Sequence, residues 1–173
     1  MNSAKLKRNT LVNFSLPESF RDWKIVTDGV MGGISQAWLT YIEGSHLVFR
    51  GEISTENNGG FASFRSPYGE YDFSDYDGLG LNIKTDDNTY RLSLRDTYKR
   101  RAPSYNHYFS TSGEWQTLLF PFSSFRHENT KQEPVSRETI TPEKIKQFYF
   151  MHYPGKEGIF QIDLKSLFLY RYS

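Results

Sequence analysis

In the segment His46-Leu47-Val48-Phe49-Arg50-Gly51-Glu52-Ile53-Ser54, apolar and polar side chains alternate along the chain. A period of two residues predicts a β-strand with one buried face, because successive side chains of a strand point to opposite sides. The set that we expect inside consists of Leu47, Phe49, Gly51 and Ile53, and the opposite set of Val48, Arg50, Glu52 and Ser54.

The same alternation returns in Gly78–Lys84, Thr89–Arg95 and Phe160–Leu164. Turn-forming residues separate these runs, and only Thr141-Pro142-Glu143 and the residues after Pro121 favour a short helical turn. Further strands are expected at Trp23–Val26, Ile34–Tyr41, Phe61–Phe64, Tyr105–Thr111, Trp115–Phe120, Gln147–Tyr153 and Leu167–Tyr170. Many short strands predict an all-β protein, an antiparallel jelly-roll β-sandwich with at most one or two short helical turns.

The composition fits a single domain with one substantial core, expected over residues 20–173 behind an N-terminal segment, 1–19. The 21 basic and 20 acidic residues give a net charge of +1, which argues against a nucleic-acid partner. The absence of cysteine excludes disulfides and zinc–thiolate sites. No run approaches the ~18 apolar residues of a membrane span, and the basic N-terminus lacks the apolar core of a secretion signal.

A glycine-rich loop follows the first expected strand of the domain, in Trp23-Lys-Ile-Val-Thr-Asp28-Gly29-Val30-Met31-Gly32-Gly33-Ile34-Ser35. Three glycines around a Val-Met pair predict positive φ angles or a close backbone approach. The spacing is not that of a phosphate-binding loop. Asp28 either holds the loop as an Asx-turn or anchors a ligand. Met31 either fills the core or stands exposed as an adaptable partner contact.

A second tight turn, Asn57-Asn58-Gly59-Gly60, precedes a strand that ends at Arg65. Arg65 either binds the carboxylate of a ligand or pairs internally with Asp28 or Glu56. If its strand shares a sheet with that of Arg95, the two arginines create an electropositive patch. We predict that Asp28 and Arg65 meet in one polar site with Arg95 nearby. The candidate binding residues are Asp28, Met31, Gly32, Gly33, Ser35, Asn58, Gly59, Gly60, Arg65 and Arg95.

No catalytic or metal-binding pattern is legible. The four histidines lack metal-motif spacing, no G-x-S-x-G elbow occurs, and the carboxylates are scattered. We therefore expect no metal, no cofactor and no enzymatic activity, and an enzyme with a pocket at Asp28, Asn58 and Arg65 ranks last among the hypotheses. The polar interval Arg126–Thr141 is predicted to form a long surface loop.

The string D-G-V-M-G-G-I-S at residues 28–35 resembles the complex I intermediate-associated protein 30 family. The likeness continues through Val48–Ser54, Asn58–Arg65, Asp75–Leu79, Tyr90–Arg95 and Gly158–Phe160, and it covers the chain from about Phe20 to Tyr170. This resemblance implies a galactose-binding-domain-like jelly roll. It also implies a non-catalytic role in the assembly of NADH:ubiquinone oxidoreductase, respiratory complex I.

The leading hypothesis is a non-enzymatic assembly factor or chaperone-like protein. Its protein partner would be a respiratory-complex subunit or an assembly intermediate. The alternative is a carbohydrate-binding module, in which Trp23, Trp38 and Trp115 would stack on sugar rings. A carbohydrate ligand is the less favoured partner because no secretion signal is apparent. We expect a cytoplasmic, bacterial protein, or a mitochondrial one if the family role is direct.

Overall fold

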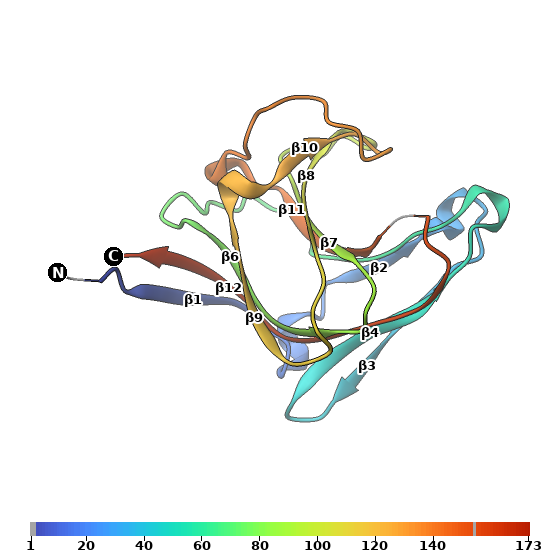
Figure 1. Ribbon diagram of the computed structural model, residues 1–173, viewed down its shortest axis with the longest axis horizontal. Coiled ribbons are helices and arrows are strands. Elements are labelled where there is room, and N and C mark those ends of the chain that lie inside the picture. Colours follow the sequence, from blue (N-terminus) through green and yellow to red (C-terminus); the bar gives the residue numbers. More distant parts are fainter. Residues whose placement is uncertain (1–2, 154) are drawn as a thin grey trace.

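The computed structural model describes residues 3–153 and 155–173 as two packed antiparallel β-sheets (Figure 1). In the first sheet the strand order is β3-β4-β12-β6-β9, with β1 paired to β12, and in the second it is β10-β8-β7-β11-β5-β2. The first sheet consists of β1 (Leu6–Asn13), β3 (Gln36–Ile42), β4 (His46–Ile53), β6 (Gly78–Thr85), β9 (Gln116–Pro121) and β12 (Gly158–Tyr172). The second consists of β2 (Lys24–Thr27), β5 (Ala62–Arg65), β7 (Tyr90–Arg95), β8 (Ser104–Phe109), β10 (Arg126–Glu128) and β11 (Gln147–His152).

The predicted jelly-roll sandwich is confirmed. Within residues 3–153 and 155–173 the helical content consists of five single turns of 3-10 helix, more than the one or two expected, and the sequence located those after Pro121 and Thr141. These turns are η1 (Pro17–Ser19), η2 (Asp28–Met31), η3 (Glu56–Asn58), η4 (Phe122–Ser124) and η5 (Pro142–Lys144).

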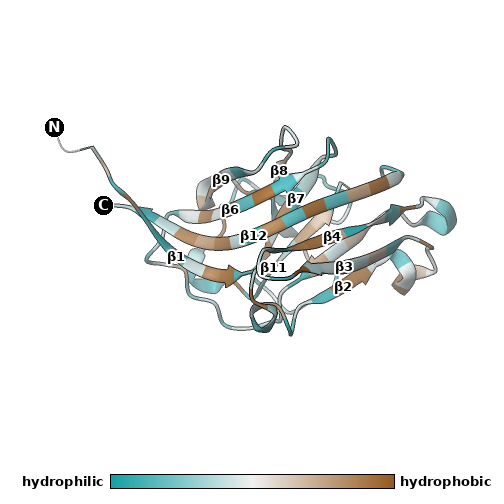
Figure 2. Cartoon of the chain, turned by 90° about the horizontal axis from the view of Figure 1, so that it is seen from below, coloured by the Kyte–Doolittle hydropathy of each residue, from teal (hydrophilic) through white to brown (hydrophobic). Residues whose placement is uncertain are grey.

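The long strand β12 joins two segments that the sequence analysis separates, Phe160–Leu164 and Leu167–Tyr170. The pairing of β12 with β6 shifts register between Leu164 and Ser166, which marks a β-bulge inside one continuous strand. One edge of β12 pairs first with β4 and then with β1. The two ends of the chain consequently lie together, and the Ser173 backbone N–H donates to the Lys5 carbonyl oxygen at 3.0 Å (Figures 1 and 2).

Two parts of the chain differ from expectation. Residues 6–13, which the sequence analysis places in a segment ahead of the domain, form β1 and extend the first sheet. The interval Arg126–Thr141 begins with the edge strand β10, so only the residues after Glu128 form a loop. Both strands lie at sheet edges and bury few side chains, so they lack the apolar alternation that identifies the inner strands.

The core lies between the sheets and is built from the inward sets that the alternation predicts. Leu47 and Phe49 on β4 are fully buried, as are Leu92 and Leu94 on β7. Aromatic rings fill much of the space: the Trp23 and Phe64 ring centroids are 4.9 Å apart. Burial of apolar area at about 25 cal/mol per Å² is the main source of stability for such a core.

Candidate functional site

The two glycine-rich turns lie side by side at one end of the sandwich, at the right-hand side of Figure 1. The first turn is η2, which directly follows β2, and the second is η3, which directly precedes β5. Antiparallel pairing of β2 with β5 brings them together, because it sets Thr27 opposite Ala62. A hydrogen bond of 3.2 Å from the Asn57 side-chain amide to the Gly32 carbonyl oxygen also joins the turns.

The fully buried carboxylate of Asp28 holds both turns together. Its Oδ1 accepts a hydrogen bond of 3.0 Å from the Ser35 backbone N–H, and its Oδ2 accepts one of 2.5 Å from the Ser35 hydroxyl. Oδ2 also accepts from the backbone N–H groups of Gly60 at 2.6 Å and Phe61 at 3.4 Å. Burial alone would raise the pKa of the Asp28 carboxyl, but these hydrogen bonds outweigh it and lower the pKa.

Three of the motif glycines are explained by this arrangement. A Cβ on Gly33 would lie 2.4 Å from Asp28 Cγ, and a Cβ on Gly59 would lie 2.5 Å from Asp28 Oδ2, so both positions require glycine. Gly32 ends η2 at φ +86°, in the left-handed region that side chains rarely adopt. Asn58 adopts φ +60°, which asparagine tolerates better than most residues, and it is exposed.

The tip of the first turn carries exposed apolar side chains. Val30 is 70% exposed and Met31 is 54% exposed, and Ile34 is exposed beside them in sequence. Of the two alternatives for Met31, the structure therefore shows the exposed one. These side chains stand on a loop that is held by hydrogen bonds between the Asp28 carboxylate and the backbone N–H groups of Ser35 and Gly60.

The predicted meeting of Asp28 with Arg65 is wrong. Lys24 is the register partner of Arg65, so Arg65 lies at the end of the β2–β5 pair away from Asp28. Arg65 donates from Nε to the Ser63 hydroxyl at 2.8 Å, and its guanidinium carbon lies 4.5 Å from the centre of the Tyr149 ring. Among residues 3–153 and 155–173, no ion pair joins Arg65 to Asp28 or Glu56.

Arg65 and Arg95 do share a sheet, and β11 runs between their strands. Tyr149 of β11 is the register partner of Arg65, and Gln147 of β11 is that of Arg95. Arg91 belongs to the same face and donates to the Tyr149 hydroxyl at 3.2 Å. We call Arg65, Arg91 and Arg95 the arginine cluster. The candidate residues thus divide between the glycine turns and the outward face of the second sheet.

The arginine cluster acts electrostatically on Tyr149. Burial alone would raise the pKa of the Tyr149 hydroxyl, but the positive charges of Arg91 and Arg65 lower it to about 8. Burial lowers the pKa of Arg65, and repulsion from Arg95 and Arg91 adds to that effect. Tyr149 and Gln147 were not among the predicted site residues. The signal that locates them is the period of two in β11, which sets Gln147, Tyr149 and Met151 on one face.

Two other kinds of site are not found in the part of the chain that the structure describes. No three His, Cys, Asp or Glu side chains gather there as metal ligands. No helix there is both long and apolar enough to cross a membrane.

The fold is that of a jelly-roll β-sandwich domain. The solved structures that resemble it include a family 11 carbohydrate-binding module from Clostridium thermocellum in complex with a β-1,3-1,4-mixed-linked tetrasaccharide, with a TM-score of 0.72, 19% identity and 94% of each chain covered. An agarase structure matches with a TM-score of 0.60 and 10% identity, over 94% of this chain and 24% of the agarase. At these identities the likeness concerns the fold alone.

The family model of complex I intermediate-associated protein 30 matches residues 12–164, so the chain belongs to that family. A curated relative, the mitochondrial complex I intermediate-associated protein 30 of Neurospora crassa, is 24% identical over 90% of this chain and 70% of its own length. Because this relative is a mitochondrial protein, the expectation of a cytoplasmic, bacterial protein is corrected.

Proposed function

We propose that the chain is a non-enzymatic assembly factor of respiratory complex I and that it binds a protein partner through the tip of the first glycine turn. The family membership supports the complex I role. The observation that carries the mode of binding is the exposure of Val30 and Met31 on a turn that a fully buried carboxylate holds in place. Exposed apolar side chains on an ordered loop favour association, because burying them against a partner removes apolar area from water.

The local construction also favours this interpretation. A loop that is already ordered loses little conformational freedom on binding, so more of the contact energy appears as affinity. Met31 has an unbranched, flexible side chain that adapts to an irregular partner surface. By covering an exposed surface of an unassembled subunit, such a protein would stabilise the subunit by mass action.

The test is complementation of cells that lack the protein. The double variant Val30→Ser, Met31→Ser should fail to restore the level of assembled complex I and should no longer co-purify complex I subunits. Ile42→Ser is the matched control, since Ile42 is an exposed apolar residue at the end of β3. Full restoration by the double variant, at a protein level equal to that of wild type, would contradict the proposal.

Carbohydrate binding has less support than this role. Sugar stacking needs open aromatic faces, but Trp23 is buried. The partly exposed Trp38 has the Arg50 guanidinium 5.4 Å from its ring centre, and Trp115 has the Lys165 ammonium at 4.5 Å. A glycan array with the purified protein separates the two functions, since neutral oligosaccharide binding without a protein partner would favour the module.

A further inference from the structure

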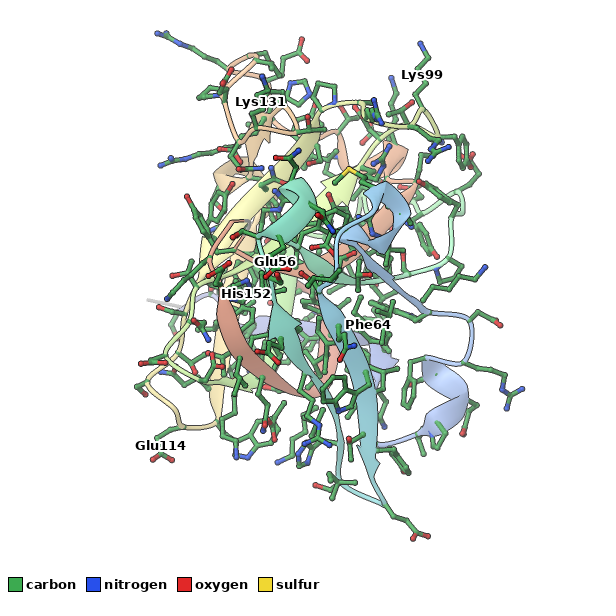
Figure 3. The ribbon with its side chains drawn as sticks, turned by 90° about the vertical axis from the view of Figure 1, so that its right-hand side faces the viewer. Glu56, Phe64, Lys99, Glu114, Lys131 and His152 are labelled. Atoms are coloured by element: carbon green, nitrogen blue, oxygen red, sulfur yellow. The ribbon has the colours of Figure 1, made fainter. Side chains whose placement is uncertain are left out.

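The outward face of the second sheet is polar and yet buried. Arg91 is 5% exposed and Arg95 is 7% exposed, although both point away from the core that Leu92 and Leu94 enter. Charged side chains are seldom buried to this degree without a partner of opposite charge. The Lys99 carbonyl oxygen accepts a hydrogen bond from the Arg95 guanidinium. The Lys99 side chain itself extends into solvent at the top of Figure 3.

Among the described residues, no carboxylate forms an ion pair with the arginine cluster. The ion pairs found there join His46 and Lys84 to Asp163, and Lys146 to Glu70, so none includes an arginine. The buried carboxylate on the same face, Glu128, accepts instead from the Asn106 amide at 2.9 Å and the Tyr108 hydroxyl at 2.7 Å.

Several hydrogen-bonding atoms of this face are buried and unpartnered. They are Nε of Arg91, Nε of Arg95 and Oε1 of Gln147. An unmade hydrogen bond on a buried charged group destabilises the fold. The two arginine Nε atoms are donors that lack an acceptor, which an anion can supply, whereas Gln147 Oε1 is itself an acceptor and needs a donor.

A pocket of about 560 Å³ connects solvent to the edge of the cluster. Arg65 and Gln147 line it, and Arg21 and Lys24 add two more positive charges against the single carboxylate of Asp22. An anionic group that enters this pocket reaches Arg65 directly. It also comes next to Gln147, the register partner of Arg95.

We propose that the arginine cluster and this pocket bind a carboxylate of an acidic peptide segment. Guanidinium groups match the planar geometry and the charge of a carboxylate. The inference deepens the proposed function, on which it rests for the partner being a protein. Oligosaccharide stacking is disfavoured here, because Arg65 and Arg91 lie over the Tyr149 ring and Tyr68 packs against Tyr98 with ring centres 5.5 Å apart.

The pKa of the Tyr149 hydroxyl gives a direct readout of anion binding at the arginine cluster. The positive groups that act on its hydroxyl are Arg91 and Arg65, and the hydroxyls of Ser104 and Ser93 also lower its pKa. A bound carboxylate offsets the arginine charges and therefore raises the pKa of Tyr149 from about 8. Spectrophotometric titration of wild type against Tyr149→Phe isolates this group among the 12 tyrosines.

The binding experiment uses a fluorescein-labelled octapeptide of glutamate and the same peptide with glutamine. The glutamate peptide should bind wild type, and Arg65→Met and Arg91→Met should each weaken binding tenfold or more. Arg171→Met is the control, because it removes the same charge from an exposed position on β12 and should change affinity less than twofold. The glutamine peptide should not bind. Circular dichroism checks that each variant folds.

Three results would overturn the proposal: no glutamate-peptide binding, equal loss in all three variants, or an unchanged Tyr149 pKa in the saturated wild-type protein. The measurement of the Tyr149 pKa uses no arginine variant, so it remains valid if an arginine variant fails to fold. An octamer of galacturonate carries the same charge on a sugar backbone, and tighter binding of it than of the peptide would overturn the peptide assignment. Because no complex I subunit is used, failure here is distinct from failure of the complementation test.

Discussion

The contact between Asp28 and Gly59 offers a sharp test of how the two glycine turns are held together. In Asp28→Ala, the backbone N–H groups of Ser35 and Gly60 lose their acceptor, and the Ser35 hydroxyl keeps only the Ser54 carbonyl oxygen at 3.2 Å. Hydrogen bonds to charged groups contribute about 1.5–3 kcal/mol each, and the donors left behind are buried. We expect the free energy of unfolding to fall by roughly 3–5 kcal/mol, near the upper end for a single substitution.

Gly59→Ala probes the same contact from the opposite side. The new Cβ would lie 2.5 Å from Asp28 Oδ2 and 2.9 Å from Asp28 Cγ, so the carboxylate must move and its hydrogen bonds must weaken. Crowding of this kind destabilises by about 1–3 kcal/mol. Without the carboxylate, the nearest remaining atom is the Glu56 carbonyl oxygen at 3.1 Å. Alanine at position 59 is therefore much better tolerated when position 28 is also alanine.

The measurement is a double-mutant cycle by urea unfolding of the two single variants and the double variant. The double variant should lose less than the sum of the single losses, by about 1–2 kcal/mol. Gly29→Ala is the control in the same turn, since its Cβ would meet only Thr27 Oγ1 at 3.3 Å. Losses that add to within about 0.5 kcal/mol would refute the idea that Gly59 is bare because of Asp28.

Three further outcomes are expected. Burial lowers the pKa of His152 to about 4 from 6.5, with an opposing effect of Asp86, so the unfolded chain binds a proton more readily and stability falls as the pH drops from 6.5 towards 4. In urea unfolding at pH 7 and 4.5, His152→Phe should lose this pH dependence, which is worth at most about 3 kcal/mol. An equal pH dependence in the variant would contradict the assignment to His152. Gly32→Val should lower the melting temperature more than Gly32→Asn, because only asparagine tolerates φ +86°, and equal effects would argue against a left-handed residue there. Deletion of residues 1–13 should destabilise the domain by removing β1 and the buried Val12, and an unchanged melting temperature would show that β1 contributes nothing.

The strands that alternate most regularly are predictable from the sequence, and the ones that do not alternate are missed. The inner strands β4, β6 and β7 follow their predicted ranges closely, because packing one face of each strand against the apolar core imposes a period of two on the apolar side chains. In contrast, β1 buries only Val12, and β10 buries only Glu128. β1 and β10 take strand conformation because they pair with β12 and β8, and that pairing does not depend on an apolar pattern in β1 or β10 themselves. Such pairing leaves no local pattern to read.

The same limit explains why the candidate site was only partly predicted. Positive φ at Gly32 and close approach at Gly33 follow from the glycine pattern itself, which is local information. The grouping of Asp28 with Arg65 depends instead on the register of β2 and β5. With Thr27 opposite Ala62 and Lys24 opposite Arg65, the antiparallel pair carries Asp28 and Arg65 to opposite ends. A register is set by pairing across the sheet, so the residues alone did not reveal it.

The two clusters of candidate residues differ in how far their polar groups are satisfied, and this difference separates their roles. Asp28 accepts four hydrogen bonds from its own chain, so its burial is explained by folding alone. The arginine cluster has like charges side by side, unpartnered Nε atoms on Arg91 and Arg95, and no carboxylate in an ion pair with it among the described residues. The partners that the chain itself offers are the Tyr149 hydroxyl and ring, the Ser63 hydroxyl and the Lys99 carbonyl oxygen, and they satisfy the guanidinium groups only in part. An anion bound at the cluster, as proposed above, would supply the acceptor that the two Nε atoms lack.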